Sequence, residues 1–178
     1  MTRGVRLIGL VVAAAALSSC GYALAGRGNS LPDYIRTIGI PVFTNQTATA
    51  ELDRVLTEAV RVEFQSRGRY RVVPESTGVD AVLTGTIKSL TLVPSAFNEN
   101  RQASRYLVQI FASVELRETR DNKVFWTNPN FRVADEYEVT SVIATNDPAS
   151  FFRQDVNALE RLARTFARSV VASILEAF

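Results

Sequence analysis

The sequence predicts an α+β fold in which two helices pack on one face of a mixed, mainly antiparallel sheet of about four to five strands. Three observations predict it. Apolar residues recur with a helical period in two segments, one in the first half of the chain and one at its end. Between them lie runs in which apolar and polar residues alternate, as in strands with one buried face. Apolar helices and a half-apolar sheet cover one another most simply as two layers.

The first half of the predicted domain mixes strands with one helix. These segments are, in order, a strand over residues 34–43, a helix over 50–67, and strands over 70–73 and 81–92. Thr47 or Thr49 can cap the start of the helix, and Gly68 suits the position after its end. Near Ser89 the apolar positions change from odd to even numbers, which indicates a bulge.

The second half is predicted to continue the sheet and to end in a long helix. Its segments are a polar loop over residues 94–104, strands over 106–116, 123–127 and 131–139, and a helix over 148–177. Asp121 and Asn122 indicate a hairpin turn. Asp147, which a proline follows, is typical of a helix N-cap. The sheet face away from the helices is expected to be mostly polar, with Leu107 and Phe111 as exceptions.

Charge and composition exclude several classes of function. The chain has 20 Lys and Arg against 18 Asp and Glu, and Arg3 and Arg6 lie in the first 19 residues. The remainder is therefore neutral, 18 against 18, which argues against a nucleic-acid partner. The chain has no histidine, which excludes His-based catalytic triads and His-bearing zinc sites. It also lacks the common nucleophile and phosphate-loop motifs, so we predict neither an enzyme nor a metal site.

The N-terminus predicts a lipid-modified cysteine. Arg3 and Arg6 precede an eleven-residue apolar run over residues 7–17, and the letters LSSC end at Cys20. This layout is that of a secretory signal peptide, and its end resembles the bacterial lipobox. Such a signal implies that Cys20 receives a diacylglycerol on its thiol and an acyl chain on its freed amine. Two alternatives stay open: an uncleaved membrane anchor, because residues 7–26 carry no charge, and a buried structural cysteine.

This interpretation divides the chain into three parts. They are a signal peptide with its lipobox over residues 1–19, an acylated tether over 20–33, and a single α/β sandwich domain over 34–178. Two or more acyl chains hold a protein stably on a membrane. Gly21 stands where an Asp often retains such lipoproteins in the inner membrane, so we expect the outer membrane. Apart from the lipid on Cys20, no cofactor is predicted.

Several segments together resemble the lipopolysaccharide-assembly lipoprotein family, LptE. The most specific are the CGY start, IPVFTNQT and VFWTNPNF, and others are ELDRVLTEAVRVEFQSRGRYRVVPE, DAVLTGTIKSL and RYLVQIFASVELRE. The resemblance implies a nonenzymatic outer-membrane lipoprotein that assembles with and plugs a β-barrel translocon delivering lipopolysaccharide to the cell surface. Its partners would be that large outer-membrane β-barrel subunit, lipopolysaccharide, and the membrane through the lipid anchor. The domain would face the periplasm or lie within the barrel lumen.

Three arginines near the ends of the long strands are candidates for lipopolysaccharide or partner contact: Arg101, Arg105 and Arg132. A guanidinium group can bind a lipid A phosphate through two hydrogen bonds. The alternative is that these are solvated loop arginines. Three aromatic residues are either partner anchors or core residues: Phe97, Trp126 and Phe131.

Two other classes of protein stay open at this stage. One is another envelope lipoprotein of similar fold, either a peptidoglycan-synthase activator or a curli-type secretion component. The other is a carboxylate-dependent hydrolase of cell-wall glycan, which would need paired acids in a cleft. The partner distinguishes the first class from the LptE resemblance. A lipoprotein of the first class would bind a peptidoglycan synthase or form a ring of copies, rather than bind a β-barrel.

Overall fold

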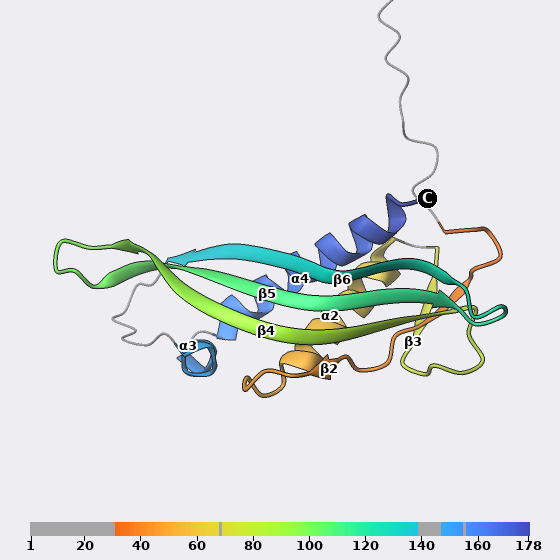
Figure 1. Cartoon of the computed structure of the whole chain (residues 1–178), viewed down its shortest axis with the longest axis horizontal. Coiled ribbons are helices and arrows are strands. Elements are labelled where there is room, and N and C mark those ends of the chain that lie inside the picture. The colour runs from red at the N-terminus through yellow and green to blue at the C-terminus, as the bar shows by residue number, and fades with distance from the viewer. Residues whose placement is uncertain (1–30, 68, 139–146, 155) are drawn as a thin grey trace, which may run out of the picture.

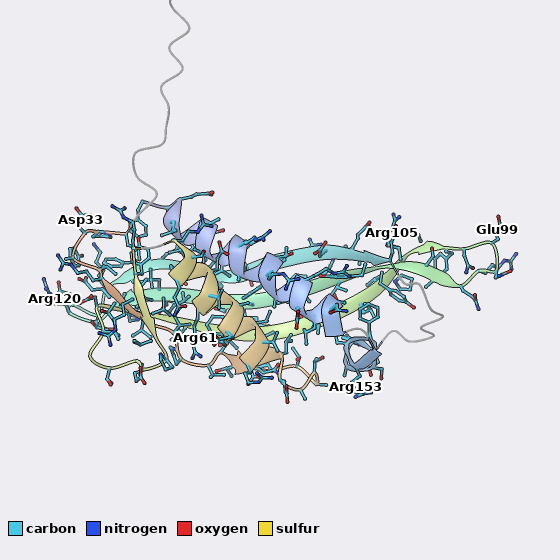
Figure 2. The ribbon with its side chains drawn as sticks, turned by 180° about the vertical axis from the view of Figure 1, so that it is seen from behind. Asp33, Arg61, Glu99, Arg105, Arg120 and Arg153 are labelled. Atoms are coloured by element: carbon cyan, nitrogen blue, oxygen red, sulfur yellow. The ribbon has the colours of Figure 1, made fainter. Side chains whose placement is uncertain are left out.

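The computed structural model describes residues 31–67, 69–138, 147–154 and 156–178. The predicted signal peptide, Cys20 and Gly68 lie outside these ranges. The elements are β1 (Thr37–Gly39), β2 (Thr44–Asn45), α2 (Leu52–Ser66), β3 (Arg71–Val73), β4 (Ala81–Phe97), β5 (Ala103–Glu118), β6 (Val124–Glu138), α3 (Pro148–Gln154) and α4 (Val156–Leu175). Figure 1 looks onto the sheet with the helices behind it, and Figure 2 shows the helix side.

The sheet is mixed and mostly antiparallel, as predicted. Its strand order is β3-β1-β4-β5-β6, and β2 pairs with β4 off that path. The short strands β1, β2 and β3 pair in parallel, whereas the long strands β4, β5 and β6 form an antiparallel meander. The helices α2 and α4 lie side by side on one face of this sheet (Figures 1 and 2). The predicted fold class is therefore confirmed.

Prolines explain two differences between the predicted and the observed strands. The predicted strand over residues 34–43 is shortened to β1, and β2 begins only after its predicted end. Pro41, which has no N–H to donate, lies between β1 and β2. The predicted loop over residues 94–104 is wrong, because β4 continues through Pro94 to Phe97 and only residues 98–102 form a turn. Among the described residues, this stretch of β4 pairs only with β5, where Pro94 is the register partner of Tyr106, and such an edge tolerates a proline.

Bulges account for the irregular register of the long strands. The bulge predicted near Ser89 is confirmed, since the pairing of β4 with β5 shifts between Ile87 and Ser89. The two strands predicted over 123–127 and 131–139 are one strand, β6. Between Asn128 and Phe131, β6 has two residues opposite a single residue of β5. This bulge interrupts the alternation of apolar and polar residues along β6, so the sequence suggested two strands.

The start of α2 differs from the prediction. Glu51 precedes the helix in the left-handed region at φ 60°, and no side chain caps the start of the helix. Thr47 and Thr49 instead close the turn before it. The Oδ1 of Asn45 accepts hydrogen bonds from the backbone and hydroxyl of Thr47, and the Thr47 Oγ1 accepts one from the N–H of Thr49. The threonines therefore stabilise the approach to the helix rather than its first turn.

The predicted C-terminal helix is two helices. Asp147 is an N-cap as predicted, because its carboxylate accepts the N–H groups of Ala149 and Ser150 at the start of α3. In Figure 1, α3 is seen end-on whereas α4 runs along the sheet. Phe151 and Phe152, about 100° apart around a helix, are both buried. A separately oriented α3 lets both rings reach the core.

The core lies between the meander and the helix pair. Every even-numbered residue of β5 from Tyr106 to Glu118 is buried. On α4, apolar residues at helical spacing are buried, namely Ala163, Phe166, Val170 and Ile174, and a neighbouring row, which includes Leu162 and Val171, is buried as well. The buried surface of α4 spans two rows because α4 packs against both β6 and α2. Among the described helices, none combines the length and apolar character of a membrane-spanning segment.

Two contacts fix the short strands to β4. Phe43 lies against Gly85, where an added Cβ would come within 2.8 Å of the ring. At the beginning of β4, the Oδ2 of Asp80 accepts the backbone N–H groups of Arg36 and Thr37 at 2.9 and 2.8 Å. The hydrogen bond from Thr37 and then that from Arg36 hold the pKa of Asp80 below its usual range.

We predict that Gly85→Ala lowers the free energy of unfolding by about 1–3 kcal/mol, because the buried Phe43 ring must shift to admit the methyl group. Urea denaturation measures the change. Thr84→Ala, at the exposed neighbouring position, is the control and should stay within about 0.5 kcal/mol of wild type. Phe43→Leu should recover part of the loss in the Gly85→Ala background. An unchanged midpoint for Gly85→Ala would contradict the contact.

We predict that Asp80→Asn lowers the melting temperature at neutral pH and that its effect disappears in acid. A carboxylate whose folded pKa is depressed stabilises the fold above its unfolded pKa, and this stabilisation is lost as the pH falls through the folded pKa. The two melting temperatures should therefore converge below the ordinary value of 3.8. Asp121→Asn, in an exposed turn, is the control. A difference that persists or grows in acid would refute the role of the charge.

Candidate functional site

The face of the meander that points away from α2 and α4 is the first candidate site, and we call it the open face. On β5 it carries the odd-numbered residues, which are only half-buried. It is mostly polar, with Leu107 and Phe111 as exceptions, in agreement with the prediction. On β4, Val93 pairs with Leu107 and is 50% exposed. It is a further apolar residue of this face that the sequence did not indicate.

Two cations lie at the centre of the open face. The guanidinium of Arg132 lies over the ring of Phe111, its register partner on β5, at 5.6 Å from the centroid. From the bulge in β4, Lys88 reaches across β5, and its Nζ donates a hydrogen bond to the carbonyl of Pro129 on β6 at 2.6 Å. Neither Lys88 nor Arg132 has an ion-pair partner within the described ranges. The centre of this face is therefore positively charged.

The two bulges produce this arrangement. The extra residue in β4 is Lys88, and the extra residues in β6 include Pro129, whose carbonyl is left outside the ladder with β5. Both bulges lie beside the segment of β5 around Ser113. A bulge lets a side chain leave the strict alternation of a strand, and here it directs a lysine across the sheet.

Arg105 has a different environment at one end of the open face. It contacts two carboxylates of β6, with 2.8 Å to the nearer oxygen of Glu138 and 3.7 Å to that of Glu136. The hydrogen bond to Glu138, followed by the charge of that carboxylate, raises the pKa of Arg105. These groups are exposed, so the pairs add little stability. Their effect is to neutralise the arginine.

Beyond Arg105 the strands β4 and β5 continue as a two-stranded arm, visible at one end of the molecule in Figure 1. Figure 2 shows Arg105 at its base and Glu99 at its tip. The Oδ1 of Asn98 orders the tip by accepting the N–H groups of Asn100 and Gln102. Phe97, 64% exposed, and Arg101, at φ 59°, lie at this tip. Within the described part of the chain, no ion pair involves Arg101.

The three predicted contact arginines do not form one cluster. Arg101 is on the arm, Arg105 is ion-paired at its base, and Arg132 lies at the centre of the open face. The register places Arg132 opposite Phe111, six residues along β5 from Arg105, or about 20 Å. Sequence reasoning did not identify Lys88. The predicted bulge near Ser89 was the signal that could have indicated it.

The three predicted aromatic anchors are separated by their burial. Phe131 is 6% exposed and packs edge-on against Phe166, with 5.7 Å between the ring centroids, so it belongs to the core. Trp126 is partly buried and packs against Phe131. Of the three, only Phe97 is largely exposed and able to meet a partner.

Among the solved structures compared, two bacterial proteins share the fold with a TM-score of 0.51. A protein of Xanthomonas campestris is 12% identical, covers 80% of this chain and 85% of its own, and superposes with a TM-score of 0.51. A hypothetical protein of Chlamydia trachomatis is also 12% identical, covers 79% of this chain and 96% of its own, and has a TM-score of 0.51. Rare lipoprotein B of Shewanella oneidensis is a weaker match. It is 14% identical, covers 76% of this chain and 91% of its own, and has a TM-score of 0.43. No curated protein matches the sequence.

A family comparison agrees with the resemblance found in the sequence. The family model for LptE, described as lipopolysaccharide-assembly, matches residues 35–174. The matched range extends from the residues before β1 almost to the end of α4 and includes the open face and the arm. The family is nonenzymatic, which confirms the expectation drawn from composition. The chain belongs to the LptE family of lipopolysaccharide-assembly lipoproteins.

Proposed function

We propose that this protein is the lipid-anchored subunit of an outer-membrane translocon for lipopolysaccharide. In this proposal Cys20 carries the anchor, a large β-barrel encloses the domain, and the open face contacts lipopolysaccharide. The observation that carries the proposal is the match of residues 35–174 to the lipopolysaccharide-assembly family. The geometry of the open face supports the contact with lipopolysaccharide.

The centre of the open face suits a phosphorylated sugar. Lys88 and Arg132 offer two positive charges whose side chains are exposed, and guanidinium and ammonium groups both bind phosphate. Around them lie hydroxyl and amide side chains that can bond sugar hydroxyls: Ser89, Thr91, Gln109 and Ser113. Lipid A combines phosphates with a sugar backbone, so its headgroup matches both features. Arg105 contributes less, because two carboxylates already neutralise it.

The arm and the overall surface suit a barrel partner. The lumen of a β-barrel is polar, and the mature chain is neutral with a mostly polar open face. The arm carries an exposed aromatic residue, Phe97, at a tip ordered by hydrogen bonds, which is the character of an interface anchor. We assign Phe97 and Arg101 to contact with the barrel or with a second part of lipopolysaccharide.

The beginning of the described chain suits attachment through Cys20. Leu31 is 2% exposed, and its N–H donates to the hydroxyl of Tyr70, so the domain is fixed from this residue on. Ten residues separate Leu31 from Cys20. The anchor therefore lies close in sequence to the folded domain, as in a short-tethered lipoprotein.

We predict that the double variant Lys88→Glu/Arg132→Glu weakens lipopolysaccharide binding about tenfold or more, since it replaces two phosphate-binding cations with anions. Fluorescence anisotropy with labelled lipopolysaccharide and purified protein measures the affinity. Arg105→Gln should have a smaller effect, and the affinity of the wild type should fall as salt is added.

The control for this experiment is Arg69→Glu, an exposed charge reversal away from the open face. Its affinity should remain close to that of the wild type. If Arg69→Glu weakens binding as much as an open-face reversal, net charge alone controls binding, and the assignment to the open face is wrong.

We predict that Cys20→Ala abolishes incorporation of labelled palmitate and leaves the signal peptide uncleaved, because no thiol remains for the lipid. Metabolic labelling and the shift in gel mobility report both effects. Ser19→Ala, which keeps a small residue before the cysteine, is the matched control and should label normally. Undiminished labelling of Cys20→Ala would rule out the lipid anchor.

A further inference from the structure

A second surface feature lies on the opposite side of the molecule from the open face. Between α2 and the pair α3 and α4 there is a groove of about 920 Å³, which we call the helix groove. Figure 2 views the molecule from this side, with α2 and α4 next to each other. The floor of the helix groove is apolar and partly buried, with Val55 and Ala59 from α2 and Leu159 from α4. Alanines on facing positions of the two helices leave the space unfilled.

The charges along the groove are separated by sign. The rim along α2 carries Glu58 and Glu63, with Glu51 just before the helix, and the rim on α3 and α4 carries Arg153, Arg164 and Arg168. One residue of the opposite sign interrupts each rim, Arg54 on α2 and Glu160 on α4. The lining therefore has four positive and four negative side chains and no net charge.

Local ion pairs leave the two rims able to bind a partner. Three acids along or just before α2 pair with nearby arginines at 2.7 to 3.3 Å, and the Glu51–Arg54 pair is exposed on both sides and therefore weak. In the other two pairs one side chain is half-buried, Arg61 at 18% and Glu63 at 20% exposed. Arg164 is 3.7 Å from Glu160, and within the described residues no ion pair involves Arg168. Exposed pairs exchange readily for intermolecular ones, so the Glu51–Arg54 pair on one rim and the Arg164–Glu160 pair on the other can contribute to docking.

The chemistry of the lining decides between occupants. A lining with no net charge does not select an anionic lipid. In a symmetric dimer a second copy would present the same concave groove, and two grooves cannot fill one another. An apolar floor between an acidic and a basic rim instead matches one helix that is apolar on one side, basic on one flank and acidic on the other.

We propose that the helix groove binds an amphipathic helix of a partner protein. The apolar stripe of that helix packs on the floor between α2 and α4. Its basic flank lies along the glutamates of α2, and its acidic flank lies along the arginines of α3 and α4. Along α2 the lining extends from Glu51, just before the helix, to Glu63, which is about 18 Å or roughly three turns of a bound helix. This partner site goes beyond the contact with lipopolysaccharide.

Site-specific photocrosslinking in intact membranes tests the proposal with the full chain. A photoreactive amino acid replaces Val62, which lines the groove and is 55% exposed, so the fold should tolerate it. Gln65, exposed on the same helix but outside the groove lining, is the matched control position. We expect an adduct from position 62 only, and mass spectrometry should place it in an amphipathic helix with the stated flanks.

Charge reversal then tests the orientation. Arg164→Glu/Arg168→Glu should reduce the adduct about tenfold, and Arg161→Glu, on α4 but outside the lining, should not. Reversing the acidic flank of the partner helix should restore the adduct. An adduct with a barrel strand, a lipid or a second copy would overturn the proposal. So would the absence of an adduct, or an adduct whose amount is unchanged by the charge reversal. Circular dichroism confirms that each variant is folded.

Discussion

Burial of one face of the β4–β5–β6 meander beneath two helices is the constraint on which the rest of the structure depends. The central strand β5 alternates without interruption, so its even-numbered residues are covered and its odd-numbered residues face outward. Since α2 and α4 occupy one face, the other face is left for contacts. The same helix pair forms the groove on the outer side of the helix layer. One packing arrangement thus produces two separate surfaces.

The long strands give these surfaces their character. Because β4 and β5 extend past the end of β6, they form an arm that places Phe97 and Arg101 away from the core. Because β4 and β6 are bulged at neighbouring positions, Lys88 crosses the sheet and lies on the same face as Arg132. A regular meander with strands of equal length would have neither feature. The irregularities that interrupt the pattern are therefore the parts that suit recognition of lipopolysaccharide in a family defined by its assembly.

The sequence predicted the features that depend on local pattern. The helical stripes, the alternation of β5, the bulge near Ser89 and the cap at Asp147 all follow from neighbouring residues, and all are present. Features that depend on distant pairing were missed. Pro94 suggested a loop, because only the sheet order shows that this part of β4 has a single neighbouring strand. The ion pairs of Arg105 and the reach of Lys88 depend on the register of β6, which periodicity does not determine.

The measurement that tests the central claim most directly is purification of the full-length protein, tagged at its C-terminus, from outer membranes in a mild detergent. Mass spectrometry then identifies and quantifies what remains bound. A lipid-anchored translocon subunit predicts one large β-barrel protein in equimolar amount, whose gel mobility changes on heating, together with lipopolysaccharide. Recovery of a peptidoglycan synthase, a ring of identical copies or the protein alone would contradict the account.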